Sequence, residues 1–389
     1  MGEAIQGSLR RDLRGAEAMR RGVGAALAVL TAVLGAPGVV AGPATGVASG
    51  NVEHVATIPF DAGLATGARQ VGKHLYVGGS KSFTIYNISE PTEPELLSIT
   101  PIGFQFAIED VDTNGKILLL SDDSGLDKLH VWDVRDKAAP VKLAELPDMP
   151  DHTFSCVFDC RWAYGARGSI VDLRKPSRPK LVGNWMPGMR PGYGFDVTEV
   201  APGRVLTATR QISLLDARRR PSDPRTRALG YTDDDRLIHS VRWPRRGRDR
   251  FFLVQGETPL SVLCDGDSGA FMTWDASRWR RTRTFRMIDE FRVKNGTAVD
   301  GNPPAGALGC TTMWFEDHPR FKNGGLVTAA FFEHGTRFLK VNDGGRISEL
   351  GHFMPAGGST IASYWITDRI VYSIDVTRGI DILRFTGDL

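Results

Sequence analysis

One short pattern recurs along the chain and constrains its fold more than any other feature. An apolar run ends in Asp or Asn, and prolines follow in the clearest copies, such as IVDLRKPSRP at residues 170–179. The Asp or Asn occupies positions 87, 133, 172, 216, 275 and 342, and position 384 is the matching place in a last copy. The spacings of 46, 39, 44, 59, 67 and 42 residues define a repeat of forty-odd residues.

The content of each repeat indicates the fold class. About four short strand-like runs with turn residues between them fill each repeat, and no long helical pattern occurs. This length and content are typical of a β-propeller blade, whereas a solenoid has shorter or helical repeats and a sandwich does not repeat. The sequence therefore predicts an all-β fold, a seven-bladed β-propeller domain over residues 45–389.

The last repeat is one strand short. Residues 362–365, 370–374 and 380–385 supply three strands, while residues 52–60 form an early strand without a partner of its own. We expect residues 52–60 to pair outside 380–385, because this N-terminal strand would complete the last blade and remove two exposed sheet edges. The longer fifth and sixth spacings predict insertions, mainly at 265–269 and 292–307.

The repeated Asp has a mechanical interpretation. A carboxylate at a strand end can accept hydrogen bonds from backbone N–H groups one or two residues later and fix the turn. Proline then ends the strand without leaving an unpaired donor. We interpret these residues as structural.

Residues 1–44 have the features of an export signal. A basic segment precedes the apolar residues 23–36, and Val39-Val40-Ala41 is a small-residue cleavage site. The apolar run is shorter than the roughly 20 residues of a membrane span; an uncleaved anchor is the alternative. We expect a signal peptide with an extended leader, and a secreted protein, extracellular or at the cell surface.

The charge balance bears on the partner. After residue 44 the chain has 43 basic and 42 acidic side chains, which argues against a nucleic-acid-binding protein. Local clusters remain, and we interpret them as solvated loop faces, with a patch for an anionic polymer of the cell surface as the alternative. These clusters are Arg218-Arg219-Arg220, Arg245-Arg246 with Arg248 and Arg250, and Arg280-Arg281 with Arg283.

The repeat resembles that of the LVIVD-repeat family of secreted or surface-anchored bacterial β-propellers, over essentially all of residues 52–389. The resemblance is strongest in residues 156–160, 170–179, 335–339 and 378–381. It implies the propeller fold and no assigned activity. Phe195 and Met313 stand where such repeats often have His, which argues against a metal site built from a ring of histidines.

Four cysteines in an exported chain suggest two disulfides. Cys156 and Cys160 flank a three-residue hairpin connection, and Cys264 and Cys310 lie in neighbouring repeats. We expect the pairs Cys156–Cys160 and Cys264–Cys310; other pairings, or thiols at a metal, are the alternatives.

Propeller ligands usually bind over the central channel. The candidate ligand-binding residues there are Asp110, His152, Asp196, His239, Ser240, Thr311 and Tyr364. A ring of small polar groups also suits channel water and backbone capping. The candidate metal ligands are His152 and His239, and Asp265 and Asp267 in a calcium-like Asp-x-Asp-x-Gly that lacks the acid at its twelfth position.

No hydrolase, phosphate-loop or zinc-protease motif occurs in the sequence. The sequence therefore favours a non-enzymatic module that binds a protein or a cell-envelope polymer. We assign no catalytic residue and no cofactor, and we expect a monomer. The alternative is a metal-assisted hydrolase or oxidoreductase with a polar site on the propeller axis.

Overall fold

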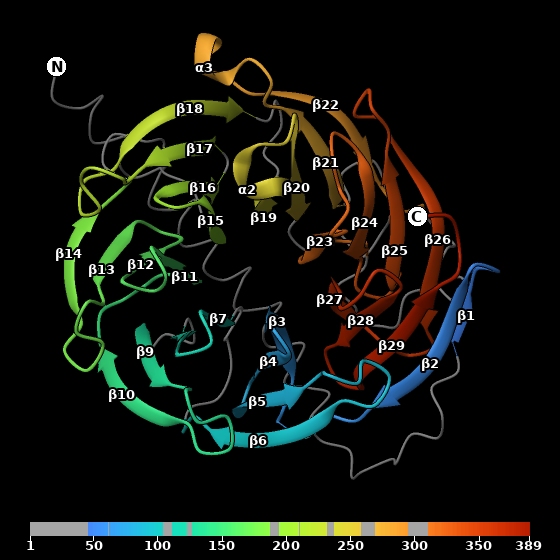
Figure 1. Ribbon diagram of the computed structural model, residues 1–389, viewed down its shortest axis with the longest axis horizontal. Helices are drawn as coiled ribbons and strands as arrows, with labels where there is room; N and C mark the ends of the chain where they lie inside the picture. Colours follow the sequence, from blue (N-terminus) through green and yellow to red (C-terminus); the bar gives the residue numbers. More distant parts are fainter. Residues whose placement is uncertain are drawn as a thin grey trace, which may run out of the picture.

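The computed structural model describes residues 46–60, 62–103, 111–122, 127–186, 194–209, 211–231, 237–257, 269–294 and 310–389. These residues form seven antiparallel sheets arranged as blades in a ring (Figure 1). The predicted seven-bladed propeller is therefore confirmed. Within the described part, no helix has the length and hydropathy needed to span a membrane.

The first four blades each contain four strands, which follow one another from the axis outward. Blade 1 has β3 (Ala65–Val71), β4 (His74–Gly79), β5 (Ser82–Asn87) and β6 (Glu95–Pro101). Blade 2 has β7 (Val111–Thr113), β8 (Ile117–Asp122), β9 (Lys128–Asp133) and β10 (Val141–Leu146). Blade 3 has β11 (Phe154–Val157), β12 (Trp162–Gly165), β13 (Ser169–Asp172) and β14 (Lys180–Asn184). Blade 4 has β15 (Asp196–Ala201), β16 (Arg204–Ala208), β17 (Gln211–Asp216) and β18 (Arg225–Tyr231).

The last three blades contain the additions to this plan. Blade 5 has β19 (Leu237–Arg242), β20 (Phe251–Glu257), β21 (Ala270–Asp275) and β22 (Arg286–Phe291), with one-turn segments α2 (Pro244–Gly247) and α3 (Trp279–Thr282) in its turns. Blade 6 has β23 (Phe315–Asp317), β24 (Gly325–Ala330), β25 (Thr336–Val341) and β26 (Ile347–Pro355). Blade 7 has β27 (Thr360–Trp365), β28 (Ile370–Asp375) and β29 (Gly379–Phe385). Most of the predicted insertions lie outside the described residues.

The N-terminal strand closes the ring as predicted. β2 (Val52–Ile58) pairs antiparallel with β29, from Val52 opposite Phe385 to Ile58 opposite Ile380. The sequence did not reveal a further strand, β1 (Gly46–Ala48), which pairs with β26 and gives blade 6 a fifth strand. Both strands lie side by side at the outer edge of the ring in Figure 1.

A buried polar cluster holds this closure together. The Asp381 carboxylate, fully buried in β29, accepts hydrogen bonds from Thr57 Oγ1 at 2.6 Å and Arg378 Nη2 at 3.1 Å, and His54 Nε2 lies 3.1 Å away. Two of these partners belong to β2, so the cluster joins the start of the fold to its end.

The repeated Asp or Asn fixes a turn in six blades, as the sequence predicts. Its side-chain oxygen accepts a hydrogen bond from the backbone N–H two residues later, at 2.8–3.2 Å. The acceptors are Asn87, Asp133, Asp172, Asp216, Asp275 and Asn342. Because each carboxylate or amide is used by the backbone, the pattern specifies architecture.

The core is divided among the blade interfaces. Seven apolar clusters of described residues lie between successive blades around the ring, including one between blades 7 and 1. In blades 1–6, the turn from the first to the second strand and the turn from the third to the fourth emerge on the same side of the ring, because successive strands alternate in direction. The turn from β27 to β28 lies on this side in blade 7, whose outer strand is β2. We call this side the turn face.

Candidate functional site

The central channel contains a polar cavity of about 110 Å³ near the turn face. Its lining includes the charged residues Arg69, Asp112, Asp196, Glu199 and Arg242 and, among other polar residues, Ser240. They come from the inner strands of blades 1, 2, 4 and 5, so the ring brings together groups that lie far apart in the sequence.

Most of the acceptors in the cavity already serve the backbone. The Asp112 carboxylate accepts hydrogen bonds from the N–H groups of Thr113 and Cys156 at 2.8 and 2.7 Å, and Arg69 Nε lies 3.2 Å from it. Glu199 Oε1 accepts from the N–H groups of Phe158 and Gly203 at 3.0 and 2.7 Å. These contacts tie the inner strands to the first turn of blades 3 and 4.

Asp196 and Ser240, both predicted axial residues, line the same cavity. Asp196 Oδ2 accepts from Thr198 Oγ1 at 2.8 Å and from the N–H of Val241 at 3.4 Å, while Ser240 Oγ donates to the Met313 carbonyl at 2.6 Å. Burial raises the pKa of Asp196 to about 6, against the opposing effect of these hydrogen bonds. Their contacts match the capping interpretation made from the sequence.

An ion cluster spans blades 5 and 6 at this end of the channel. Arg242 Nε lies 3.0 Å from Asp317 Oδ1, and Arg242 Nη2 lies 3.2 Å from Glu316 Oε1. Burial raises the pKa of Glu316 to about 7, although Arg242 lowers it. This cluster and Asp112 were absent from the predicted set, although a charged residue inside an apolar inner strand is a sequence signal for such a position.

The two candidate histidines meet in an aromatic environment. The ring centroids of His152 and His239 are 6.3 Å apart, and Phe195 packs against both at 4.8 and 5.3 Å. Trp314 lies 4.9 Å from His239, which is 1% exposed. Burial, followed by His152, lowers the pKa of His239 to about 3, so its ring is neutral at pH 7.

These surroundings offer few metal ligands. Among the described residues no group of three His, Cys, Asp or Glu side chains has a metal-binding arrangement. Asp110, Asp265 and Asp267 lie outside the described residues. Thr311 is buried, and Tyr364 is a cavity residue whose hydroxyl accepts a 3.4 Å hydrogen bond from the Ala68 N–H.

The predicted disulfide in blade 3 is present. Cys156 and Cys160 are bonded across the turn between β11 and β12, with a Cα–Cα distance of 4.3 Å. Phe158, Asp159 and Cys160 have positive φ angles of 55°, 59° and 54°. Cys264 lies outside the described residues, so its bond to Cys310 stays a prediction.

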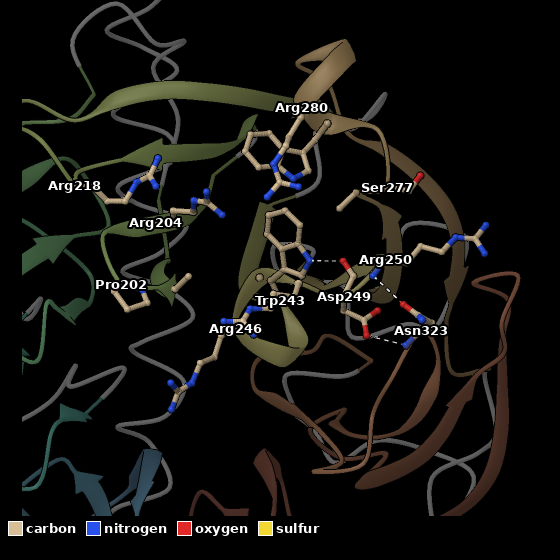
Figure 2. A pocket seen from close by; sticks show the side chains of 15 residues that line it. Pro202, Arg204, Arg218, Trp243, Arg246, Asp249, Arg250, Ser277, Arg280 and Asn323 are labelled. Carbon is tan, nitrogen blue, oxygen red and sulfur yellow. Dashed lines mark hydrogen bonds between the residues drawn. The ribbon is translucent and has the colours of Figure 1, made fainter.

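A larger site opens on the turn face between blades 4 and 5. This groove of about 660 Å³, which we call the arginine groove, is shown in Figure 2. Its cationic lining residues are Arg204, Arg218, Arg246, Arg248, Arg250 and Arg280, and Trp243 and Trp279 are buried beneath them. All three arginine clusters noted in the sequence contribute to it, so they are not independent loop faces.

The carboxylate of Asp249, in the arginine groove, is hydrogen-bonded to the backbone. Asp249 is the one acid among the described lining residues; its carboxylate accepts from the N–H groups of Phe251 and Asn323 at 3.0 and 2.7 Å. Its carbonyl accepts from Trp243 Nε1 at 2.8 Å (Figure 2). Asp249 therefore builds the groove wall, and its carboxylate is not paired with a groove arginine.

The guanidinium groups differ in how they are held. Arg218 is bound by Asp216, at 2.7 and 2.8 Å. Arg204 and Arg280 instead lie over the Trp279 ring, with guanidinium carbons 5.8 and 5.0 Å from its centroid. In the described ranges no carboxylate pairs with Arg204, Arg246, Arg248 or Arg280.

The guanidinium groups in the arginine groove repel one another electrostatically. The pKa of Arg204 is lowered by burial first, then by Arg218 and Arg280, with Asp216 opposing. Arg204 is isolated in the sequence, at the start of β16, and for that reason it was absent from the predicted clusters. Its proximity to them follows from the packing of blade 4 against blade 5.

Comparison with known proteins supports the fold alone. No protein-family model and no curated protein sequence matches the chain. The structure is similar to the WD40 β-propeller domain of Doa1, with a TM-score of 0.58 and 10% sequence identity, covering 86% of this chain and 97% of that one. At this identity the similarity concerns the arrangement of blades.

Proposed function

We propose that the chain is an exported, non-enzymatic binding module of the LVIVD-repeat type that holds an acidic partner, a protein or a cell-envelope polymer, in the arginine groove. The signal-like leader and the Cys156–Cys160 disulfide support export, since disulfides persist in oxidising compartments. A propeller fold commonly supports binding, and the groove supplies a site for it.

One observation carries the proposal: guanidinium groups without carboxylate partners gather on one groove. Elsewhere on the turn face, the arginine that follows the repeated Asp is paired, as in Arg135 with Asp133 and Arg174 with Asp172. Arg204 and Arg280 lack such partners and lie 5.8 and 5.0 Å from one indole ring. Uncompensated, mutually repelling cations attract an anionic ligand.

The test compares charge reversal inside and outside the groove. We expect the Arg204→Glu/Arg280→Glu double variant to lose sedimentation with envelope fractions, and capture of secreted acidic proteins, at about 0.1 M salt, where screening is still moderate. The matched control is Arg135→Glu/Arg174→Glu on the same face. Equal binding by both double variants and the unaltered protein would refute the proposal.

The alternative, a metal-assisted hydrolase or oxidoreductase on the axis, has one observation in its favour, the 6.3 Å separation of the His152 and His239 rings. Elemental mass spectrometry on untagged, chelator-free protein distinguishes the two functions. One equivalent of a transition metal per chain, lost in His239→Ala together with turnover, would favour the enzyme.

A further inference from the structure

The arginine groove continues into a second depression of the turn face. That depression, of about 150 Å³, shares Arg204, Arg218, Trp279 and Arg280 with the groove. It adds Leu214, Asp216, Arg227 and Arg283. The Asp216 carboxylate is bound by Arg218 at 2.7 Å and lies 3.8 Å from Arg227, so arginines outnumber the single acid among the described lining residues of this depression. Because of the residues they share, the groove and the depression form one continuous basic surface across blades 4 and 5, which we call the arginine track. It has more cationic side chains than one small anion can contact.

The cations of this track are all arginines. No lysine is among the described lining residues of either depression. A guanidinium presents several N–H donors in a planar fork, which suits bidentate contact with oxyanions. Arg204 lies near both Arg218 and Arg280, so an anion bound here has guanidinium donors on more than one side. A tetrahedral phosphate or sulfate offers more oxygens for this than a carboxylate does.

The aromatic rings of the track are closed to ligands. Trp243 and Trp279 are 5% and 7% exposed, and arginines cover Trp279. Single-stranded nucleic acids bind on exposed aromatic faces that stack with bases. The track provides charge without a stacking surface, which disfavours nucleic acids and favours an anionic chain without aromatic groups.

The geometry points to a ligand class: the arginine track binds a linear polymer that carries repeated tetrahedral oxyanions, which are phosphate or sulfate groups. This inference rests on the proposed function. Successive groups of the polymer contact the Arg246 and Arg248 end, then the Arg204 and Arg280 centre, then the Arg227 and Arg283 end. The buried Trp279 indole ring supports both central arginines, Arg204 and Arg280.

The salt dependence of binding follows from the number of neutralised charges. Each anionic group contacted contributes a slope of about −0.7 to −0.9 in a plot of log affinity against log salt concentration. Five arginines of the groove lack a carboxylate partner in the described part of the chain, and one of them, Arg250, donates instead to the Asp343 carbonyl at 3.0 Å. The other four predict a slope of roughly −3.

The experiment measures the affinity of the full protein for four probes of matched charge at several salt concentrations. Inorganic polyphosphate and dextran sulfate separate phosphate from sulfate as the source of the oxyanion. Polyglutamate represents an acidic peptide, and a single-stranded oligonucleotide represents nucleic acid. We expect polyphosphate, dextran sulfate or both to bind at least tenfold more tightly than the other two, and orthophosphate to compete weakly.

Two sets of variants locate the site. Arg204→Ala/Arg280→Ala should lower affinity by roughly tenfold or more for each lost guanidinium and reduce the size of the salt slope by roughly 1 to 2. Arg204→Lys/Arg280→Lys keeps the charge and the cover on Trp279, so it should keep the slope while affinity falls. Arg174→Ala is the matched control, because Arg174 also covers an indole, Trp162, at 5.3 Å.

The outcomes separate this inference from the proposed function. Equal binding of polyglutamate and polyphosphate, with both lost in the alanine variant, would overturn the oxyanion assignment and leave an acidic partner in the groove. Unchanged affinity in the alanine variant for every probe that binds would overturn both. A lysine variant that binds like the unaltered protein would overturn the guanidinium argument, and so would tight binding of orthophosphate alone.

Discussion

Replacing His239 with Phe tests whether this channel histidine is a buried neutral ring. Its imidazole is enclosed by Phe195 and Trp314, with ring centroids 5.3 and 4.9 Å away. Burial lowers its pKa from 6.5 to about 3, with His152 adding to the effect and the nearby Met313 backbone opposing it. Phe keeps a ring in this aromatic site and removes the titration.

The sign and size of the effect follow from linkage. Because the folded pKa is depressed, the contribution of His239 to stability is fully present above pH 6.5 and is lost as pH falls toward 3. A shift of one pKa unit corresponds to about 1.4 kcal/mol. Between pH 6.5 and 4.5, His239 should therefore remove about 2 kcal/mol from the free energy of unfolding, and the variant should not show this loss.

The assay is urea denaturation followed by tryptophan fluorescence at several pH values between 7.5 and 4.5. The measured quantity is the difference between the two proteins in their change with pH, so any constant packing cost of the substitution cancels. Burial lowers the pKa of His130 to about 4, so this residue and the carboxylates also change stability with pH. Their contribution is the same in both proteins and cancels in the difference. Parallel stability curves for the two proteins would contradict a buried neutral imidazole.

Three further predictions concern the ring and its turns. Asp381→Ala should cost about 3–5 kcal/mol of unfolding free energy, because Arg378 and Thr57 lose a buried partner; an equal loss in Asp381→Asn would argue against this charge pairing. Cys156→Ser/Cys160→Ser should cost about 2 kcal/mol, the loop entropy of a short bridge, and an unchanged denaturation midpoint would count against it. Asp172→Ala should cost about 1 kcal/mol through its lost turn hydrogen bond, and thermal unfolding at neutral pH would show whether it does.

The fold was predictable because its information is local and repeated. Each Asp or Asn marks a strand end by a hydrogen bond within two residues, as in Asp172 to the N–H of Arg174. Counting these marks gives the number of blades, and the missing last strand requires β2. β1 was missed because its three residues, GVA, contain no alternation that distinguishes a strand from an extended leader.

The site was harder to predict because it depends on contacts between blades. The clusters around Arg218, Arg246 and Arg280 are visible in the sequence, but their convergence requires the packing of blade 4 on blade 5. Arg204 has no basic neighbour in the chain and joins them only in space. On the axis, Asp112 lines the described cavity without having been predicted, while the predicted Asp110 lies outside the described residues.

The pairing of β2 with β29 sets the order in which the ring can be completed. β2 is synthesised well before its partner strand β29, which lies some 330 residues later in the chain. The intervening blades can form by local contacts, whereas the pairing of β2 with β29 joins segments far apart in the chain and carries the entropic cost of closing a long loop. A chain that stops before β29 retains an unpaired β2 and an open blade edge, a ready target for proteases and for aggregation. The pairing of β2 with β29 thus makes resistance to proteolysis and aggregation depend on synthesis of the chain through β29.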